Sequence, residues 1–121
     1  MLTVDLMEKE GIALLRPEGA LTEEDFKYAA RIIDSYIENS GKLNGIIINV
    51  RSFPGWASFS ALTKHLSFIK EHHKKVSRVA FSTDSPLLEF AEPIARHFVD
   101  AEIKHFSFNE LNNAIEWASE A

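Results

Sequence analysis

The sequence contains no cysteine among its 121 residues. This excludes a disulfide framework, a thiolate-ligated metal site and a cysteine nucleophile. No apolar run approaches the ~20 residues that a membrane-spanning helix needs. Acids stand near the N-terminus at Asp5 and Glu8, where a signal peptide would carry basic residues. We therefore expect no signal peptide and a cytoplasmic location.

Motifs for several common chemistries are also missing. The sequence has no G-x-S-x-G, no P-loop and no G-x-G-x-x-G, which argues against a serine hydrolase and a nucleotide-binding enzyme. Its five histidines form no HExxH motif and no i, i+4 pair, so we predict no metal site. We expect a protein without a cofactor and without enzymatic activity.

Composition and charge describe an ordinary globular chain, with 45% hydrophobic and 11% aromatic residues. Its length predicts one domain spanning residues 1–121. The net charge of −5 is unevenly distributed: residues 1–40 carry −5, residues 41–83 carry +6 and residues 84–121 carry −6. The acidic total argues against nucleic-acid binding, whereas the basic middle segment suits a phosphate or an anionic membrane surface.

Periodicity predicts the fold class. Five segments have strand patterns, and they are Leu2–Met7, Ile12–Pro17, Leu43–Val50, Val76–Ser82 and Ala101–Phe108. The short connection between the first two predicts an antiparallel hairpin. The other strands alternate with helical patterns, which predicts parallel pairing. We therefore expect an α/β fold, with a mixed five-stranded sheet and four helical segments mostly on one face.

Capping residues mark the ends of the helical segments. Thr22 is a good N-cap, and Gly41 is the expected αL residue at the end of the first helix. Ser107 and Glu110 have the spacing of a capping box before the last helix. Pro93 interrupts the third segment, Ser85–Phe98, and makes that segment a candidate gate.

The expected site follows the central strand, because ligands of open α/β sheets lie beyond the carboxyl ends of parallel strands. A Pro-Gly turn there carries Trp56, whose ring either lines a pocket, anchors at a membrane or packs onto the core. Further apolar residues of the next two helical segments suit a binding wall. The predicted ligand-binding residues are Phe53, Trp56, Phe59, Leu62, Leu66, Phe90 and Phe98.

Our main hypothesis is a module that binds an apolar or lipid-like ligand and associates reversibly with membranes. Aromatic and basic residues together are typical of peripheral binding to anionic lipid, with ~1 kcal/mol from each base near the surface. The predicted membrane contacts are Trp56, Lys64, Lys70, Lys74 and Lys75.

Several short motifs, in this order, suggest a family. They are Phe53-x-Gly55-Trp56, Ala61-Leu62, His72-His73, Arg78-Val79-Ala80, and Glu110 with Ala114 and Trp117. Together they resemble the SpoIIAA-like family, whose fold relates to STAS domains and to the lipid-binding CRAL-TRIO fold. The CRAL-TRIO relation implies an apolar ligand between helices and sheet.

The STAS relation implies a different function, a regulatory protein-interaction domain of the anti-sigma-antagonist type. Such domains are phosphorylated on a serine of an Asp-Ser-Ser-Gly motif after the central strand. This chain has Gly55-Trp56-Ala57-Ser58 there instead, and its available hydroxyls are Ser58 and Ser60. The alternative hypothesis is therefore a phosphorylation-switched module with a protein partner. The ligand, the partner and the existence of a homodimer stay open.

Overall fold

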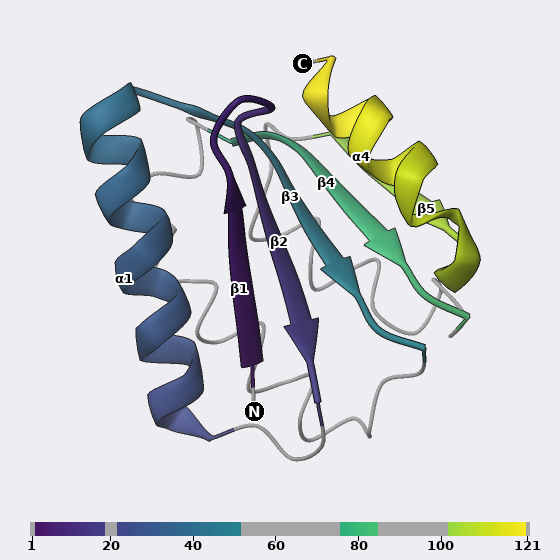
Figure 1. Ribbon diagram of the computed structural model, residues 1–121, viewed down its shortest axis with the longest axis horizontal. Helices are drawn as coiled ribbons and strands as arrows, with labels where there is room; N and C mark the ends of the chain where they lie inside the picture. The colour runs from purple at the N-terminus through teal and green to yellow at the C-terminus, as the bar shows by residue number, and fades with distance from the viewer. Residues whose placement is uncertain (1, 19–21, 52–75, 85–101, 121) are drawn as a thin grey trace.

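The computed structural model describes residues 2–18, 22–51, 76–84 and 102–120. Its elements are β1 (Leu2–Met7), β2 (Ile12–Pro17), α1 (Glu23–Ser40), β3 (Leu43–Asn49), β4 (Val76–Ser82), β5 (Glu102–Phe106), the 3-10 helix η3 (Phe108–Glu110) and α4 (Leu111–Ser119). The strands form a single sheet in the order β1-β2-β3-β4-β5 (Figure 1). β1 and β2 are antiparallel and all other pairs are parallel. The predicted mixed sheet is confirmed.

Strand boundaries follow the periodicity closely. β1, β2 and β4 have the predicted bounds, and β3 ends one residue earlier than expected. β5 is shorter than the predicted Ala101–Phe108, because the chain leaves the strand at Ser107 to begin η3. Ala101 itself lies outside the described residues.

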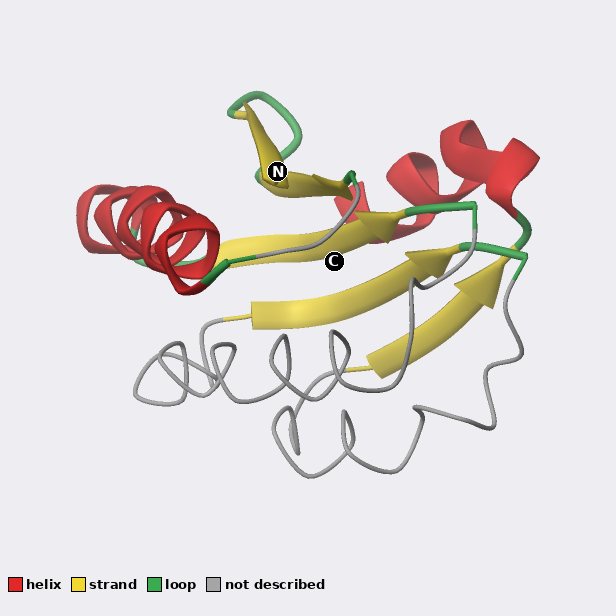
Figure 2. Ribbon diagram, turned by 90° about the horizontal axis from the view of Figure 1, so that it is seen from below, coloured by secondary structure: helices red, strands yellow, loops and turns green. Residues whose placement is uncertain are grey.

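The two described α-helices lie on opposite faces of the sheet (Figure 2). Ile33 and Ile37 of α1 share one buried cluster with Ile46 and Ile48 of β3. Ile47, between those two strand residues, belongs to a second cluster with α4. A strand buried on both sides requires a cover on each, and α1 and α4 supply one cover apiece. The expectation that the four helical segments lie mostly on one face stays a prediction. The second and third predicted helical segments lie outside the described residues.

The predicted caps of α1 are both present. The Thr22 hydroxyl accepts a hydrogen bond from the Asp25 backbone N–H at 3.2 Å, and the Asp25 carboxylate accepts from the Thr22 N–H at 2.9 Å. The bond from the Thr22 backbone N–H lowers the pKa of Asp25, and a second bond to this carboxylate, from the Thr22 hydroxyl at 3.1 Å, lowers it further. Gly41 ends the helix with φ +85°, a conformation that costs glycine little.

A glycine lets α4 approach the centre of the sheet closely. A Cβ added to Gly45 of β3 would lie 2.6 Å from the Cβ of Ala118, which is far inside van der Waals contact. Ala118 is fully buried. The small side chains of this pair thus set how closely α4 packs on β3.

Candidate functional site

Buried polar side chains join the carboxyl ends of β3 and β4. The Asn49 Nδ2 donates to the Ser82 Oγ at 3.2 Å and to the Ser82 carbonyl oxygen at 3.4 Å. The Ser82 Oγ in turn donates to the carbonyl oxygens of Ser107 at 3.0 Å and Phe108 at 3.3 Å. Asn49 is 8% exposed and Ser82 is fully buried. Such a satisfied buried network rigidifies the structure around it.

The residues that follow these strands are also tied together. The Asp84 N–H donates to the Arg51 carbonyl oxygen at 3.0 Å, and the Thr83 Oγ1 donates to the same oxygen at 3.3 Å. The Asp84 carboxylate accepts from the Phe108 N–H at 3.1 Å. Thr83 also bonds β5, since its carbonyl oxygen contacts the His105 Nε2 at 2.8 Å. The segment after β3, at Arg51, and the segment after β4, at Thr83 and Asp84, are therefore fixed relative to each other.

A hollow of about 410 Å³ lies beside this network. Its lining comes from the ends of β2 and β3 and from η3, and comprises Arg16, Pro17, Glu18, Asn49, Val50, Arg51 and Phe108. The Arg51 guanidinium lies over the Phe108 ring, with Cζ 4.9 Å from the ring centroid. We call this hollow the carboxyl-edge site.

The chemistry of the carboxyl-edge site suits an anionic group. Two of its lining residues, Arg16 and Arg51, carry guanidinium groups, and one, Glu18, carries a carboxylate. Guanidinium groups bind carboxylate and phosphate through paired N–H donors. Stacking on Phe108 limits the orientations open to Arg51, so less conformational freedom is lost on binding.

The described residues of the carboxyl-edge site lie at the carboxyl ends of the parallel strands, and none of them is among the predicted site residues. All of the predicted site residues lie outside the described ranges: Phe53, Trp56, Phe59, Leu62, Leu66, Phe90 and Phe98 of the wall; Lys64, Lys70, Lys74 and Lys75; and Ser58 and Ser60. Their roles stay predictions. The gate proposed around Pro93 is also outside the described residues.

Sequence reasoning missed the residues that the structure brings together here. A signal was available, because Asn49 interrupts an apolar run and Ser82 ends the neighbouring strand. Polar residues at the carboxyl ends of adjacent parallel strands lie close together at the same end of the sheet. Arg16 carried no such signal, since its place in the same lining as Arg51 depends on the pairing of β2 with β3.

Two further observations concern the described residues alone. They contain no group of three His, Asp or Glu side chains placed to hold a metal ion. In the same part of the chain, neither α-helix has the length and apolarity required to cross a membrane.

Comparison with known proteins identifies a family. The model of the SpoIIAA-like family matches residues 12–119, which include every described element except β1. No curated protein sequence matches the chain, and no solved structure does.

Proposed function

The chain belongs to the SpoIIAA-like family, and we propose that it is a non-enzymatic regulatory module that binds a protein partner at the carboxyl-edge site. The observation that carries this proposal is the pair of arginines, Arg16 and Arg51, beside a rigid polar network. The relation of the family to STAS domains supports a regulatory role over a carrier role.

The hydrogen bonding of the Ser82 hydroxyl supports a binding role for this site rather than a catalytic one. The Ser82 hydroxyl is buried and donates its proton to backbone carbonyl oxygens. A nucleophilic serine needs a general base within hydrogen-bond reach. Among the described residues, the contact of Ser82 with another side chain is with the Asn49 amide, which donates to it and is no base.

Phosphorylation would regulate such a site through charge. Ser58 and Ser60 follow Arg51 by seven and nine residues in the sequence. A phosphate adds about −1.5 to −2 charge and three strong acceptors. We propose that phosphorylation of either serine changes partner binding by competing for the arginines that an acidic group of the partner would otherwise occupy.

The test is crosslinking in the cells that make the protein. A photo-crosslinking amino acid replaces Glu18 at the carboxyl-edge site, and the control carries it at the exposed Glu116 of α4. We expect a discrete protein adduct from position 18 that is absent from position 116. Arg51→Ala should reduce its yield. Identical adducts from both positions would refute a partner at this edge.

Two parallel measurements separate regulation from lipid binding. Mass spectrometry of the protein isolated from cells should find phosphate on Ser58 or Ser60. Sedimentation with anionic liposomes should leave the protein in the supernatant. Retention on liposomes without any phosphorylation would favour the apolar-ligand hypothesis instead.

A further inference from the structure

The outer edge of β1 is open within the described part of the sheet. There, β1 pairs with β2 alone. Leu2 lies opposite Pro17, and proline has no N–H to donate, so this is a non-hydrogen-bonded pair. Because such pairs alternate along an antiparallel ladder, Val4 and Leu6 also belong to non-hydrogen-bonded pairs. Their backbone N–H and C=O groups therefore point away from β2.

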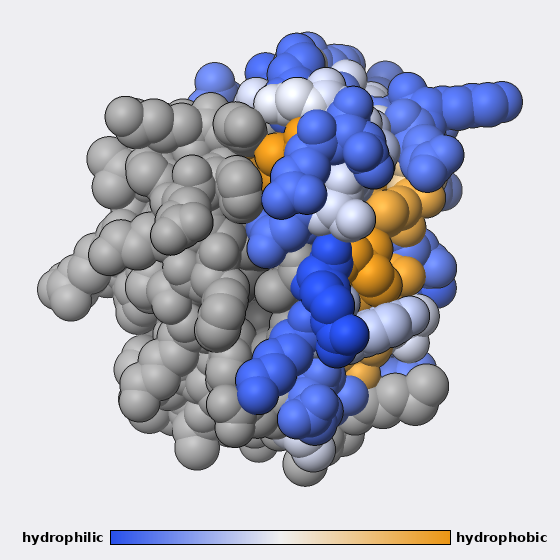
Figure 3. Space-filling view, turned by 90° about the vertical axis from the view of Figure 1, so that its left-hand side faces the viewer, coloured by the Kyte–Doolittle hydropathy of each residue, from blue (hydrophilic) through white to orange (hydrophobic). Residues whose placement is uncertain are grey.

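A groove runs between β1 and α1 alongside this edge. It encloses about 690 Å³, and its lining includes Leu6, Ile32, Tyr28 and Tyr36. Tyr28 is 52% exposed, and it is the large hydrophobic residue that stands out on the described surface. Figure 3 shows apolar side chains uncovered beside the polar surface of α1. The Tyr36 hydroxyl reaches the carbonyl oxygen of Glu8 at 3.4 Å and joins the helix to the hairpin.

An open strand edge beside an apolar groove has the two parts of a strand-addition site. The free backbone groups supply main-chain hydrogen bonds, and the groove accepts alternate side chains of the added strand. We propose that β1 binds an extended, basic segment of a partner protein as a sixth strand of the sheet. Apolar side chains at every second position of that segment would enter the β1–α1 groove.

Charge decides between a partner and a second copy of this chain. The charged residues of β1 and of the groove lining are Asp5, which is exposed, Glu8 and Arg31, so two acids stand against one base. Symmetric antiparallel pairing of two β1 strands would bring two such acidic surfaces together. When the pairing is centred on Asp5, it also places the two exposed Asp5 side chains opposite each other, and like charges directly opposite are destabilising. A basic segment meets the same surface with complementary charge.

This surface is separate from the carboxyl-edge site. The carboxyl-edge site lies at the far end of the parallel strands from the β1–β2 turn, and the two linings share no residue. A test of strand addition at β1 therefore does not depend on whether the proposed function is correct.

The experiment uses the full chain and a fluorescent eight-residue peptide of alternating valine and lysine. One control peptide replaces lysine with glutamate, and another has four valines followed by four lysines. We expect anisotropy to report binding of the alternating basic peptide only. The amide NMR signals of Val4 and Leu6 should shift on binding and become protected from hydrogen exchange.

Two variants test the two parts of the site. Tyr28→Ser removes an exposed groove wall and should weaken binding about tenfold. Val4→Pro removes an outward N–H and should abolish the protection at Leu6. Asn112→Ser, on the exposed surface of α4, is the matched control and should leave binding unchanged.

Three results of the peptide experiment would overturn the proposal. They are equal binding of the basic and acidic peptides, insensitivity to Tyr28→Ser, and shifts confined to residues away from β1. A concentration-dependent dimer that Val4→Pro dissociates would assign the edge to a second copy and would also overturn it. Because Tyr28 is half exposed, its variant should remain folded even if Val4→Pro does not.

Discussion

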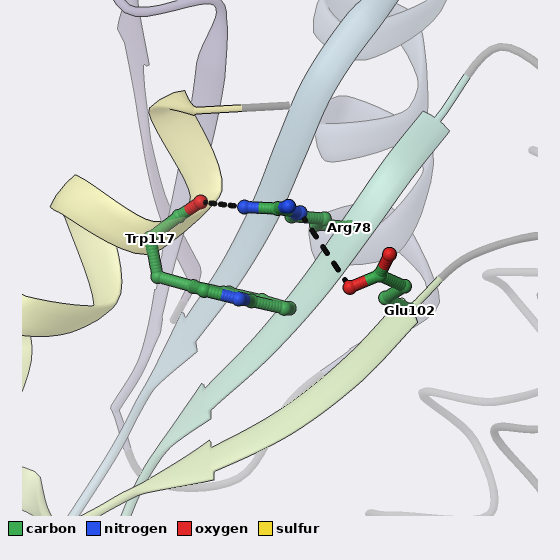
Figure 4. A network of polar contacts seen from close by, with 3 residues as sticks. All are labelled: Arg78, Glu102 and Trp117. Carbon is green, nitrogen blue, oxygen red and sulfur yellow. Dashed lines mark hydrogen bonds and ion pairs between the residues drawn. The ribbon is translucent and has the colours of Figure 1, made fainter.

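The guanidinium group of Arg78 lies over the indole ring of Trp117, with Cζ 4.9 Å from the ring centroid (Figure 4). An Arg78 N–H also donates to the carbonyl oxygen of Trp117, so one side chain holds both the ring and the backbone of α4. On its other side Arg78 lies 3.8 Å from the Glu102 carboxylate of β5. Arg78 thus fastens α4 to the sheet near β4 and β5.

We predict that Arg78→Ala lowers the free energy of unfolding by about 1–2 kcal/mol, from one lost hydrogen bond and one lost cation–π contact. Urea denaturation measures this loss. Arg78→Lys should recover only part of it, because an ammonium group lacks the planar fork. Glu102→Ala should be nearly neutral, since the Glu102 side chain is 71% exposed. A larger loss for Glu102→Ala than for Arg78→Ala would contradict this account.

The contact between Gly45 and Ala118 predicts a mutant pair. Gly45→Ala should cost about 1–3 kcal/mol by overpacking, because its Cβ would meet that of Ala118 at 2.6 Å. Adding Ala118→Gly should restore part of the loss, although glycine within a helix itself costs about 1 kcal/mol. Thermal unfolding of the two single variants and the double variant measures the coupling. If the losses of the two single variants simply add in the double variant, α4 can move away from β3 and this contact does not set their spacing.

The polar network between β3 and β4 should behave as a unit. Asn49→Ala and Ser82→Ala should each cost about 1–3 kcal/mol, because each leaves a buried group without its partner. The double variant should lose less than the sum of the two, since Asn49 and Ser82 bond each other. Denaturant titration of all four proteins checks this. Thr3→Ala, on the edge strand β1, is a control outside the network.

Stability should fall in acid partly through two capping boxes. A hydrogen bond from the Thr22 backbone lowers the pKa of Asp25, and one from the Ser107 backbone lowers that of Glu110. A lowered pKa contributes stability that is present above the ordinary carboxyl value and is lost as the pH falls through the folded-state value. The loss should therefore begin below about pH 4.5, the ordinary value for Glu110.

Asp25→Asn and Glu110→Gln test this acid dependence. Each variant should be less stable than the parent at neutral pH, and the difference should shrink as the pH falls below 4. Both carboxyl groups are exposed, so the effects should be small. Unfolding followed by circular dichroism from pH 7 to pH 2 measures them. A difference that grows in acid would show that neither box stabilises the charged form.

Local patterns accounted for much of the fold. The alternation of β1, the apolar run of β3, the Thr22 and Gly41 caps and the box at Ser107 are all properties of neighbouring residues. Such signals depend on the spacing of apolar residues and on the residue types at helix ends, and both can be read from the sequence directly. The end of the sheet at which a site would form followed from the parallel topology.

The tertiary structure decided which distant residues meet. Periodicity indicated that β3 is buried on both faces, but it did not tell which helix covers which face. Only strand order brings Arg16 and Arg51 into the lining of one hollow and leaves β1 at an edge next to α1. Pairing between strands depends on residues far apart in the sequence, whereas helix caps and the alternation of apolar residues depend on residues a few positions apart. For that reason the sequence determined the elements of this protein, and packing alone determined its surfaces.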